Sequence, residues 1–273
     1  MALTLTAELV TRMTRFFRDS AVLRARLCEQ IEGNPLGASV QSFGPAVAIK
    51  YLDGGPIHSN QVFGLGTDTL EAESLGSLDA ILALYREDGL CCDLQLDGPS
   101  IEPEAAARLA EKHLLVTRLV STQFGLPTAA PPPPGVTVRR VVGEAREECF
   151  QLFMDVFEVP PEEREEILLT ERFENSQPGS HLYIASVEGI PAAAASLDIR
   201  DGIGHLTAGA TLPQFRRRGY QAALIQKRLA DALEEGCDLA VGNAAPHSGS
   251  RQNMERAGLR TAVLGLLLTD CSN

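Results

Sequence analysis

The stretch TLPQFRRRGYQAALIQKR, residues 211–228, contains in immediate succession the end of a predicted strand, a basic turn and the start of a predicted helix. Upstream of the turn the residues show no helical apolar period, and Pro213 ends the strand. Downstream, apolar residues recur at helical spacing over 222–233, and Gly236 stands where a C-terminal cap belongs. The sequence therefore predicts a strand, a turn and an amphipathic helix at the centre of a domain.

The turn itself carries three arginines, Arg216, Arg217 and Arg218, followed by Gly219. A helix N-terminus has unpaired backbone N–H groups and a partial positive charge, and glycine admits a close approach of the ligand. This combination predicts a phosphate-binding turn. A solvated basic turn is the alternative. A nucleic-acid site is disfavoured because the formal net charge of −12 leaves no broad basic face.

Arg216, Gly219 and the helix after them resemble the Arg/Gln-x-x-Gly-x-Gly/Ala signature of the GNAT superfamily, the acyl-CoA-dependent N-acyltransferases. The resemblance continues through the predicted strand 237–241 and the segment 246–259. The Ser-x-x-Asn-x-Glu-Arg-x-Gly-Leu pattern of that segment is similar to the last helix of the family. Gln221 departs from the signature, because it occupies the last small-residue position.

The resemblance implies that acetyl-CoA is the co-substrate and that the amides of the turn bind its pyrophosphate. It also places the backbone of residues 210–212 along the pantetheine arm and Asn253 near the thioester; a local helix hydrogen bond is an equal alternative for Asn253. The implied CoA-binding residues are Ala210, Thr211, Leu212, Arg216, Arg217, Arg218, Gly219, Tyr220, Gln221, Ala222 and Asn253.

The resemblance assigns the catalytic residues less directly than the CoA-binding residues. Many members of the family carry a tyrosine four residues before the glycine equivalent to Gly258, where its hydroxyl protonates the departing thiolate. Met254 occupies that position here, and a thioether donates no proton. Ser250, one helical turn earlier, and His247 are the substitutes that we consider. A helix cap or a CoA contact is the alternative for Ser250, and an exposed loop position for His247. Catalysis without a dedicated acid is a further alternative.

The proline-rich stretch 129–135 predicts a stiff linker, and a ligand for a proline-recognition module is the minor alternative. The predicted fold is α/β with a mixed sheet, as two GNAT-like domains in tandem: a degenerate domain at 1–128, the linker, and an acetyltransferase domain at 136–273 that carries the acyl-CoA site. The predicted helices are 7–30 (one or two), 78–86, 102–112, 144–157 and 222–235; the predicted strands are 38–43, 46–51, 62–65, 91–96, 115–124, 136–142, 181–187, 191–199, 206–212 and 237–241.

Composition restricts the remaining possibilities. The six cysteines show no metal-ligand or disulfide spacing, so we expect no metal site and a reducing cytoplasm. No signal-peptide core or membrane-spanning run is evident, and we expect no membrane or nucleic-acid partner. The chain is expected to be a monomer or a homodimer that binds acetyl-CoA and a small amine-bearing acceptor. The acidic segment 158–180 either attracts that amine or is a solvated helix.

Three functions remain open. The first, which we favour, is an N-acetyltransferase that transfers an acetyl group from acetyl-CoA to an unidentified amine. The second is a non-catalytic acetyl-CoA sensor, suggested by Met254. The third is a scaffold protein, which the intact turn at 216–219 argues against.

Overall fold

The computed structural model describes residues 3–53, 60–65, 69–96, 100–130, 133 and 135–270. These residues form two compact units. The C-terminal unit spans Ser121–Ala262 and includes the first residues of the chain, and the N-terminal unit spans Leu5–Val120 and includes the chain from Val263 onward. Each unit is described by itself.

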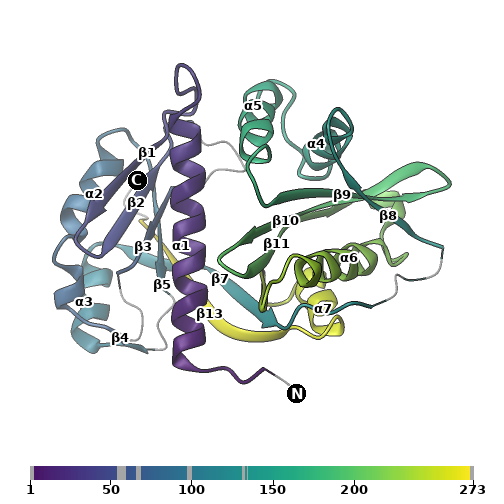
Figure 1. Ribbon diagram of the computed structural model, residues 1–273. Helices are drawn as coiled ribbons and strands as arrows, with labels where there is room; N and C mark the ends of the chain where they lie inside the picture. The colour runs from purple at the N-terminus through teal and green to yellow at the C-terminus, as the bar shows by residue number, and fades with distance from the viewer. Residues whose placement is uncertain are drawn as a thin grey trace. The chain divides into compact units, whose positions relative to one another are not determined.

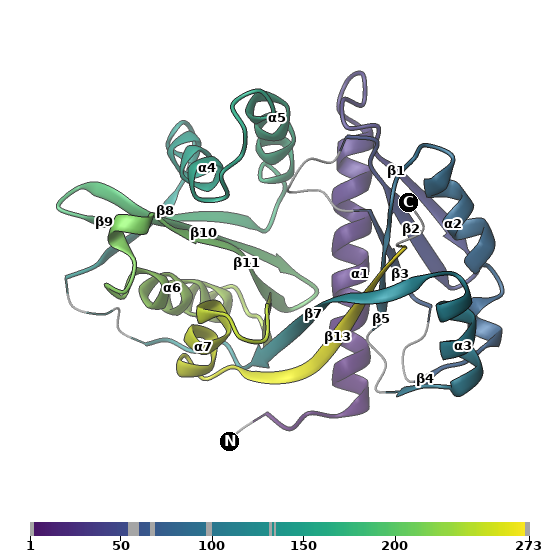
Figure 2. The same cartoon turned by 180° about the vertical axis from the view of Figure 1, so that it is seen from behind.

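The C-terminal unit is a mixed sheet covered by helices on both faces. Its elements are β8 (Thr137–Val141), α4 (Ala145–Val156), α5 (Arg164–Glu174), β9 (Ser180–Val187), β10 (Ile190–Arg200), β11 (Ile203–Thr211), α6 (Tyr220–Glu234), β12 (Leu239–Ala244) and α7 (Gly249–Arg256). Strands β8 to β11 pair antiparallel in chain order, and β12 pairs parallel with β11. Helices α4 and α5 cover one face of this sheet, and α6 and α7 lie on the other (Figures 1 and 2).

The core of this unit lies between the sheet and α6. Leu224 and Ala232 on α6 pack with Tyr183, Ala193, Ala195 and Leu197 of β9 and β10, and a second cluster joins Ile225 and Leu229 to Leu206, Ala240 and Met254. The run of alanines in β10 is fully buried, as expected for a central strand with helices on both faces. The helix ends as predicted: Gly236, just past the C-cap, adopts a left-handed φ of 80°.

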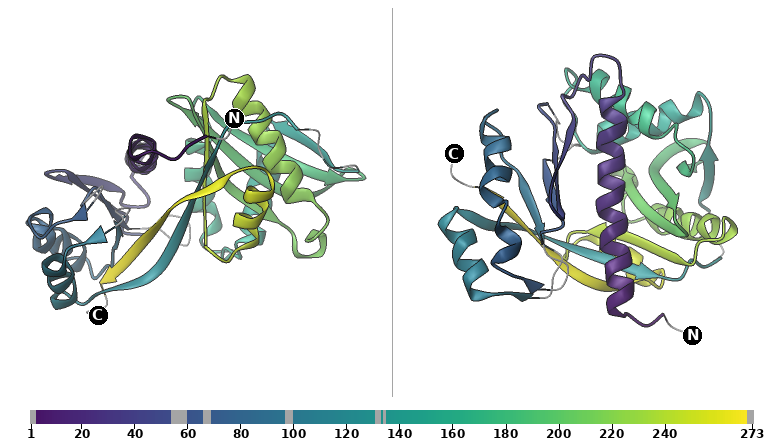
Figure 3. Two further views of the ribbon diagram at one scale, coloured as in Figure 1. Left: turned by 90° about the horizontal axis from the view of Figure 1, so that it is seen from below. Right: turned by 60° about the vertical axis from the view of Figure 1, so that its left-hand side comes forward.

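The N-terminal unit also has helices on both faces of a sheet. Its elements are α1 (Ala7–Glu29), β1 (Ser39–Phe43), β2 (Ala46–Lys50), β3 (Gln61–Phe63), β4 (Thr69–Leu70), α2 (Leu78–Arg86), β5 (Asp93–Leu96), β6 (Ser100–Ile101), α3 (Pro103–Glu111) and the first part of β7 (Leu114–Gly125). Helix α1 packs on the face that contains Ile49, whereas α2 and α3 pack on the face that contains Ala48. Figure 3 shows α1 end-on in its left view and lengthwise in its right view.

Most of the predicted elements are present within a few residues of the expected bounds. The segment 7–30 is one helix, begun by Thr6, whose hydroxyl accepts a hydrogen bond from the Leu9 amide at 3.2 Å. The short strands β4 and β6 were not predicted, because two-residue strands carry no periodic signal. The sequence Asp53-Gly54-Gly55 also predicts a turn, which lies largely outside the described residues, and so do three of the four prolines in 131–134.

The division into units differs from the predicted boundary in the proline-rich stretch 129–135. It falls inside β7 and inside β13 (Arg260–Asp270), two long strands with different partners along their length. Residues 121–125 of β7 pair with β12, whereas Leu266–Thr269 of β13 pair with β5. Composition gives no sign of such long-range pairing. No described helix is long and apolar enough to cross a membrane.

Candidate acyl-CoA site

The site begins where two parallel strands stop pairing. Strands β11 and β12 pair only over Ile203–His205 and Leu239–Val241. Both strands continue beyond this point, β11 to Thr211 and β12 to Ala244, while β7 pairs with the other edge of β12 over Ala240–Ala244. The carboxyl ends of β11 and β12 are therefore unpaired with each other, and such a point in an α/β sheet is where ligands commonly bind.

The turn after β11 leads directly into the helix α6. A short 3-10 helix (Pro213–Phe215) follows the strand, and Gly219 is the N-cap residue with a left-handed φ of 86°. No side chain caps α6 and no acidic residue lies in its first turn, so its first amides remain available to an anion. Arg217 also has a positive φ, 63°, a conformation that is strained for a residue with a side chain.

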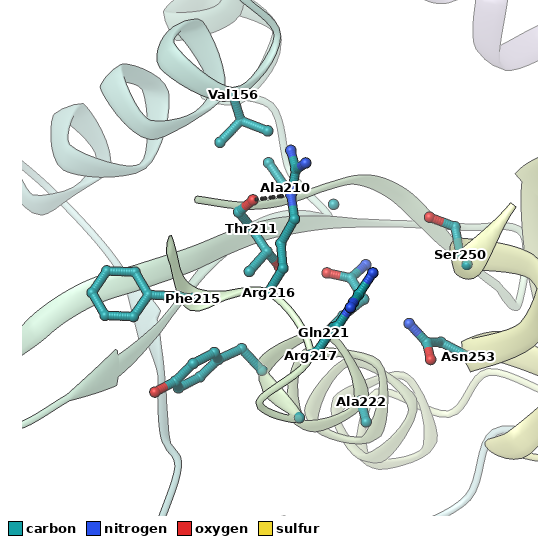
Figure 4. Close-up of a pocket in the computed structure, with 14 residues that line it drawn as sticks. Val156, Ala210, Thr211, Phe215, Arg216, Arg217, Gln221, Ala222, Ser250 and Asn253 are labelled. Atoms are coloured by element: carbon teal, nitrogen blue, oxygen red, sulfur yellow. Dashed lines mark hydrogen bonds between the residues drawn. The ribbon is translucent and has the colours of Figure 1, made fainter. Parts of the chain in front are cut away.

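A cavity of about 600 Å³ opens at this helix start (Figure 4). Its wall combines the end of β11, the basic turn, the first turn of α6, the start of α7 and the last residue of α4. The residues that line it are Val156, Gly209, Ala210, Thr211, Phe215, Arg216, Arg217, Gly219, Tyr220, Gln221, Ala222, Gly249, Ser250 and Asn253. Residues far apart in the sequence are thus brought to one opening.

Most of the predicted CoA-binding residues line this cavity, and Leu212 and Arg218 do not. The Arg218 guanidinium instead lies over the Phe215 ring, 5.8 Å from its centroid. Arg216 donates from Nε to the Thr211 carbonyl at 3.2 Å, which ties the turn to the end of β11 (Figure 4). Val156, Gly209, Phe215 and Gly249 also line the cavity; nothing in their local sequence distinguished them.

Three polar side chains in the wall differ in how they are satisfied. Asn253 accepts a hydrogen bond at Oδ1 from Arg256 at 3.1 Å, and because arginine only donates, this contact leaves the amide nitrogen of Asn253 free to donate to a ligand. The Gln221 carboxamide lies against Gly209: a Cβ at that position would stand 2.5 Å from Nε2. Within the described residues, the buried Oε1 of Gln221 and Oγ1 of Thr211 have no hydrogen-bond partner.

The two candidates for proton transfer and Met254, which occupies the usual tyrosine position, lie in different surroundings. Ser250 lines the cavity, and the cap of α7 is Ser248, whose hydroxyl accepts from the Arg251 amide at 3.2 Å. His247 is not among the lining residues. Met254 is only 5% exposed and packs against β12, where a Cβ on Gly242 would stand 2.8 Å from its sulfur. The position that holds tyrosine in many relatives is therefore a core position here.

A buried cation that the sequence analysis did not identify lies next to Ala208, the residue before the cavity wall. Arg228 is 2% exposed, and its Nη1 donates to the carbonyl oxygens of Ser196 at 2.9 Å and Ala208 at 3.4 Å. Its place on the apolar face of α6, between Leu224 and Ala232, was the available signal. No group of three or more His, Cys, Asp or Glu suited to a metal ion occurs in the described part of the chain.

Comparison with known proteins agrees with this geometry. Residues 146–258 match the sequence model of the Acetyltransferase (GNAT) family. This segment is a GNAT acetyltransferase domain. The matched residues lie within the C-terminal unit and contain the whole lining of the cavity. No curated protein matches the sequence.

The similarity to solved structures extends beyond the residues of the GNAT domain. A GCN5-related N-acetyltransferase from Kribbella flavida aligns with a TM-score of 0.64 at 20% identity, over 92% of this chain and 96% of that one. A tandem GNAT protein from the clavulanic acid biosynthesis pathway aligns with 0.60 at 13%, over 85% and 83%. A GCN5-related N-acetyltransferase from Sphaerobacter thermophilus aligns with 0.58 at 16%, over 84% and 81%. At these identities the similarity shows the fold, a mixed α/β fold with a GNAT domain at its C-terminal side.

Proposed function

We propose that the chain is an N-acetyltransferase that transfers the acetyl group of acetyl-CoA to the amine of a small acceptor. The observation that carries the proposal is the cavity at the start of α6. It combines an uncapped helix N-terminus, a left-handed glycine and two arginines at the point where two parallel strands separate. Phosphate groups suit the helix start because amide donors and the helix dipole both favour negative charge there.

Different residues of the cavity wall would bind different parts of acetyl-CoA. The amides of 217–222 would hold the pyrophosphate, and Arg216 and Arg217 would contact the outer phosphates. The backbone of Ala210–Leu212 would run beside the pantetheine arm, which brings the thioester toward Asn253 and Ser250. Holding the thioester beside a neutral amine supplies most of the rate enhancement, since orientation replaces a bimolecular encounter.

The chemical step needs little acid catalysis from this chain. The neutral amine nitrogen attacks the thioester carbonyl carbon, and the nitrogen of the tetrahedral intermediate gives up one proton. The C–S bond then breaks, and the thiolate leaves with the bonding electron pair and takes up a proton to give CoA. A thiolate leaves without prior protonation because thiols have a pKa near 8.5. Met254 lies in the core and offers no proton, so Ser250 is the proposed side chain for proton transfer and His247 the more distant candidate.

The N-terminal unit, Leu5–Val120 with the chain from Val263 onward, is proposed to be a degenerate GNAT-like domain that corresponds approximately to the predicted domain at 1–128. None of the five cysteines that the structure describes is part of a disulfide, which supports the cytoplasm as the proposed compartment.

A second candidate function is an acetyl-CoA sensor, favoured by the burial of Met254. Thiol release from acetyl-CoA in the presence of a panel of primary amines separates the two. The proposed function predicts release that requires both acetyl-CoA and one class of amine, and that is lost in Gly219→Asp. Binding of CoA without release for any amine would favour the sensor.

A further inference from the structure

Arg228 combines complete burial with a charge that no carboxylate neutralises. It is among the largest buried side chains of the chain, and no described residue forms an ion pair with it. Burying an unpaired guanidinium is costly unless its donors are satisfied. Burial lowers the pKa of Arg228 to about 10, so the group still carries its charge at neutral pH. A cation retained at such a site suggests a role beyond packing.

Each hydrogen bond that this guanidinium donates within the described part of the chain goes to a main-chain carbonyl. Nε donates to Leu224 in the preceding turn of α6 at 3.2 Å, and Nη1 donates to Ser196 of β10 and to Ala208 of β11. The side chain therefore links the helix to two adjacent strands. The planar guanidinium suits this task because its donors point in fixed, diverging directions.

The two strand carbonyls belong to an irregularity in the sheet. Ala195 pairs with Gly209, but Leu197 pairs with Leu206, so β11 has one residue more than β10 between these pairs. This is a β-bulge, which leaves backbone groups outside the regular ladder and redirects the strand. The hydroxyls of Ser196 and Thr207 hydrogen-bond each other at the same place.

The bulge lies directly before the cavity wall. Ala208 accepts from Arg228, and the next three residues, Gly209, Ala210 and Thr211, all line the cavity. The direction in which β11 leaves the bulge sets where these three residues stand. A hydrogen bond from a cation also polarises the peptide group of Ala208 and Gly209, and a buried positive charge favours the negative charge that develops on the thioester oxygen.

We propose that Arg228 is a positioning residue of the acyl-transfer site, which holds the bulge between β10 and β11 so that Gly209–Thr211 and their peptide groups face the thioester correctly. This inference rests on the proposed function. It assigns Arg228 to the chemical step and not to nucleotide binding, because the hydrogen-bond partners of Arg228 are Leu224, Ser196 and Ala208, and none of them belongs to the phosphate turn at 216–219.

The test compares Arg228→Met, Arg228→Lys and the matched control Lys227→Met in the full chain. Methionine keeps the length and removes the charge, and lysine keeps the charge but not the planar fork. Lys227 is the neighbouring residue on α6, ion-paired with Asp231 at 2.6 Å. The measurements are the Kd for CoA by calorimetry, kcat for thiol release with the amine that the wild type uses best, and amide hydrogen exchange over 193–211.

Arg228→Met is expected to lower kcat on the order of 100-fold, the loss that a displacement of about 1 Å can cause, with CoA affinity within about threefold of the wild type. The kcat of Arg228→Lys should lie between the values of Arg228→Met and the wild type. The kcat of Lys227→Met should match that of the wild type. Exchange over 193–211 should quicken only in the Arg228 variants. An unchanged kcat in folded Arg228→Met, or a loss of CoA affinity as large as the loss of kcat, overturns the inference.

The remaining outcomes are also decisive. If Arg228→Met does not fold, Arg228→Lys decides by the same criteria, and failure of both to fold contradicts the inference because the guanidinium then serves the fold alone. If the wild type binds CoA but releases no thiol with any amine, the proposed function fails. The bulge is then judged by hydrogen exchange, and unchanged exchange over 193–211 in Arg228→Met overturns the inference separately.

Discussion

The chain contains two strand–helix–strand crossovers with the same topology. The side chains at the start of their two helices carry opposite charge. In the C-terminal unit, the antiparallel strands β9, β10 and β11 precede α6, and β12 returns parallel to β11. In the N-terminal unit, the antiparallel strands β1, β2 and β3 precede α2, and β5 returns parallel to β3. The difference lies in how each helix begins.

Helix α6 begins at a left-handed glycine after three arginines, with no acidic residue in its first turn. Helix α2 begins at Ser77 after a 3-10 turn that contains Glu73, and Asp79 lies in its first turn, ion-paired with Lys112. An anion is attracted to the first helix start and repelled by the acidic side chains at the second. The comparison teaches that the crossover topology is a scaffold, and that the turn residues decide whether it binds a phosphate.

The largest effect is expected from Gly219→Asp. Space is open around this residue, since a Cβ there meets only Pro133 Cβ at 4.0 Å, so the fold should persist. The carboxylate would stand at the helix start in place of a phosphate, and CoA binding should become undetectable by calorimetry. The matched control is Gly236→Asp, at the other end of α6, with a φ of 80° and no atom within 4 Å. Equal losses in both variants would attribute the effect to backbone strain.

The next effect concerns the three arginines. Arg216→Ala and Arg217→Ala should each weaken CoA binding by about 1 to 3 kcal/mol, the range for hydrogen bonds to charged groups, and should flatten its salt dependence. Arg218→Ala should weaken CoA binding less, because the Arg218 side chain lies over Phe215 and not in the cavity wall. Titrations at low and high salt check this. Three equal, salt-independent losses would mean that the arginines support the fold instead of contacting phosphates.

Met254→Tyr tests whether a family-like tyrosine can be restored at a core position. Because Met254 packs closely on Gly242, the larger ring should destabilise the protein by about 1 to 3 kcal/mol, the range for overpacked cores, without raising kcat. Urea unfolding and thiol release measure the two effects, and Met254→Leu is the control of similar volume. A faster enzyme of unchanged stability would show that position 254 reaches the thioester.

The smallest effect is expected in the N-terminal unit. Asp79→Asn removes a negative charge from the first turn of α2 and breaks the ion pair with Lys112. CoA affinity of the full chain should stay within about twofold, since an exposed pair such as this contributes little. Calorimetry of Asp79→Asn and of Arg216→Ala compares the CoA affinities of the two variants. A clear gain of affinity, or a second CoA bound per chain, would place a phosphate site at α2.

Much of the fold could be predicted because its elements are periodic and well delimited. Gly236 and Pro213 mark the end of α6 and the end of β11, and the alternating strands from β8 to β11 follow the expected order. The division of β7 and β13 between two units could not be predicted, because it depends on which strand each half pairs with. Such long-range pairing leaves no trace in a local pattern.

The candidate site shows the same limit at the level of single residues. The turn at 216–219 and the first residues of α6 could be assigned because their neighbours along the chain explain them. Val156 and Gly209 enter the cavity wall only through tertiary structure. Arg228 lies at an apolar position of its helix, and its role can be proposed only from its hydrogen bond to the β-bulge of β10 and β11. Side chains that act across elements are therefore the part that sequence reasoning misses.

The most direct test of the central claim is amide hydrogen exchange of the full chain with and without CoA, followed peptide by peptide. The account predicts slower exchange on CoA binding in peptides that cover 209–222 and 249–253, where the cavity wall lies. It predicts no change in peptides that cover 69–80, at the start of α2. Protection at 69–80, or CoA binding that leaves 209–222 unprotected, would contradict the assignment of the acyl-CoA site to α6.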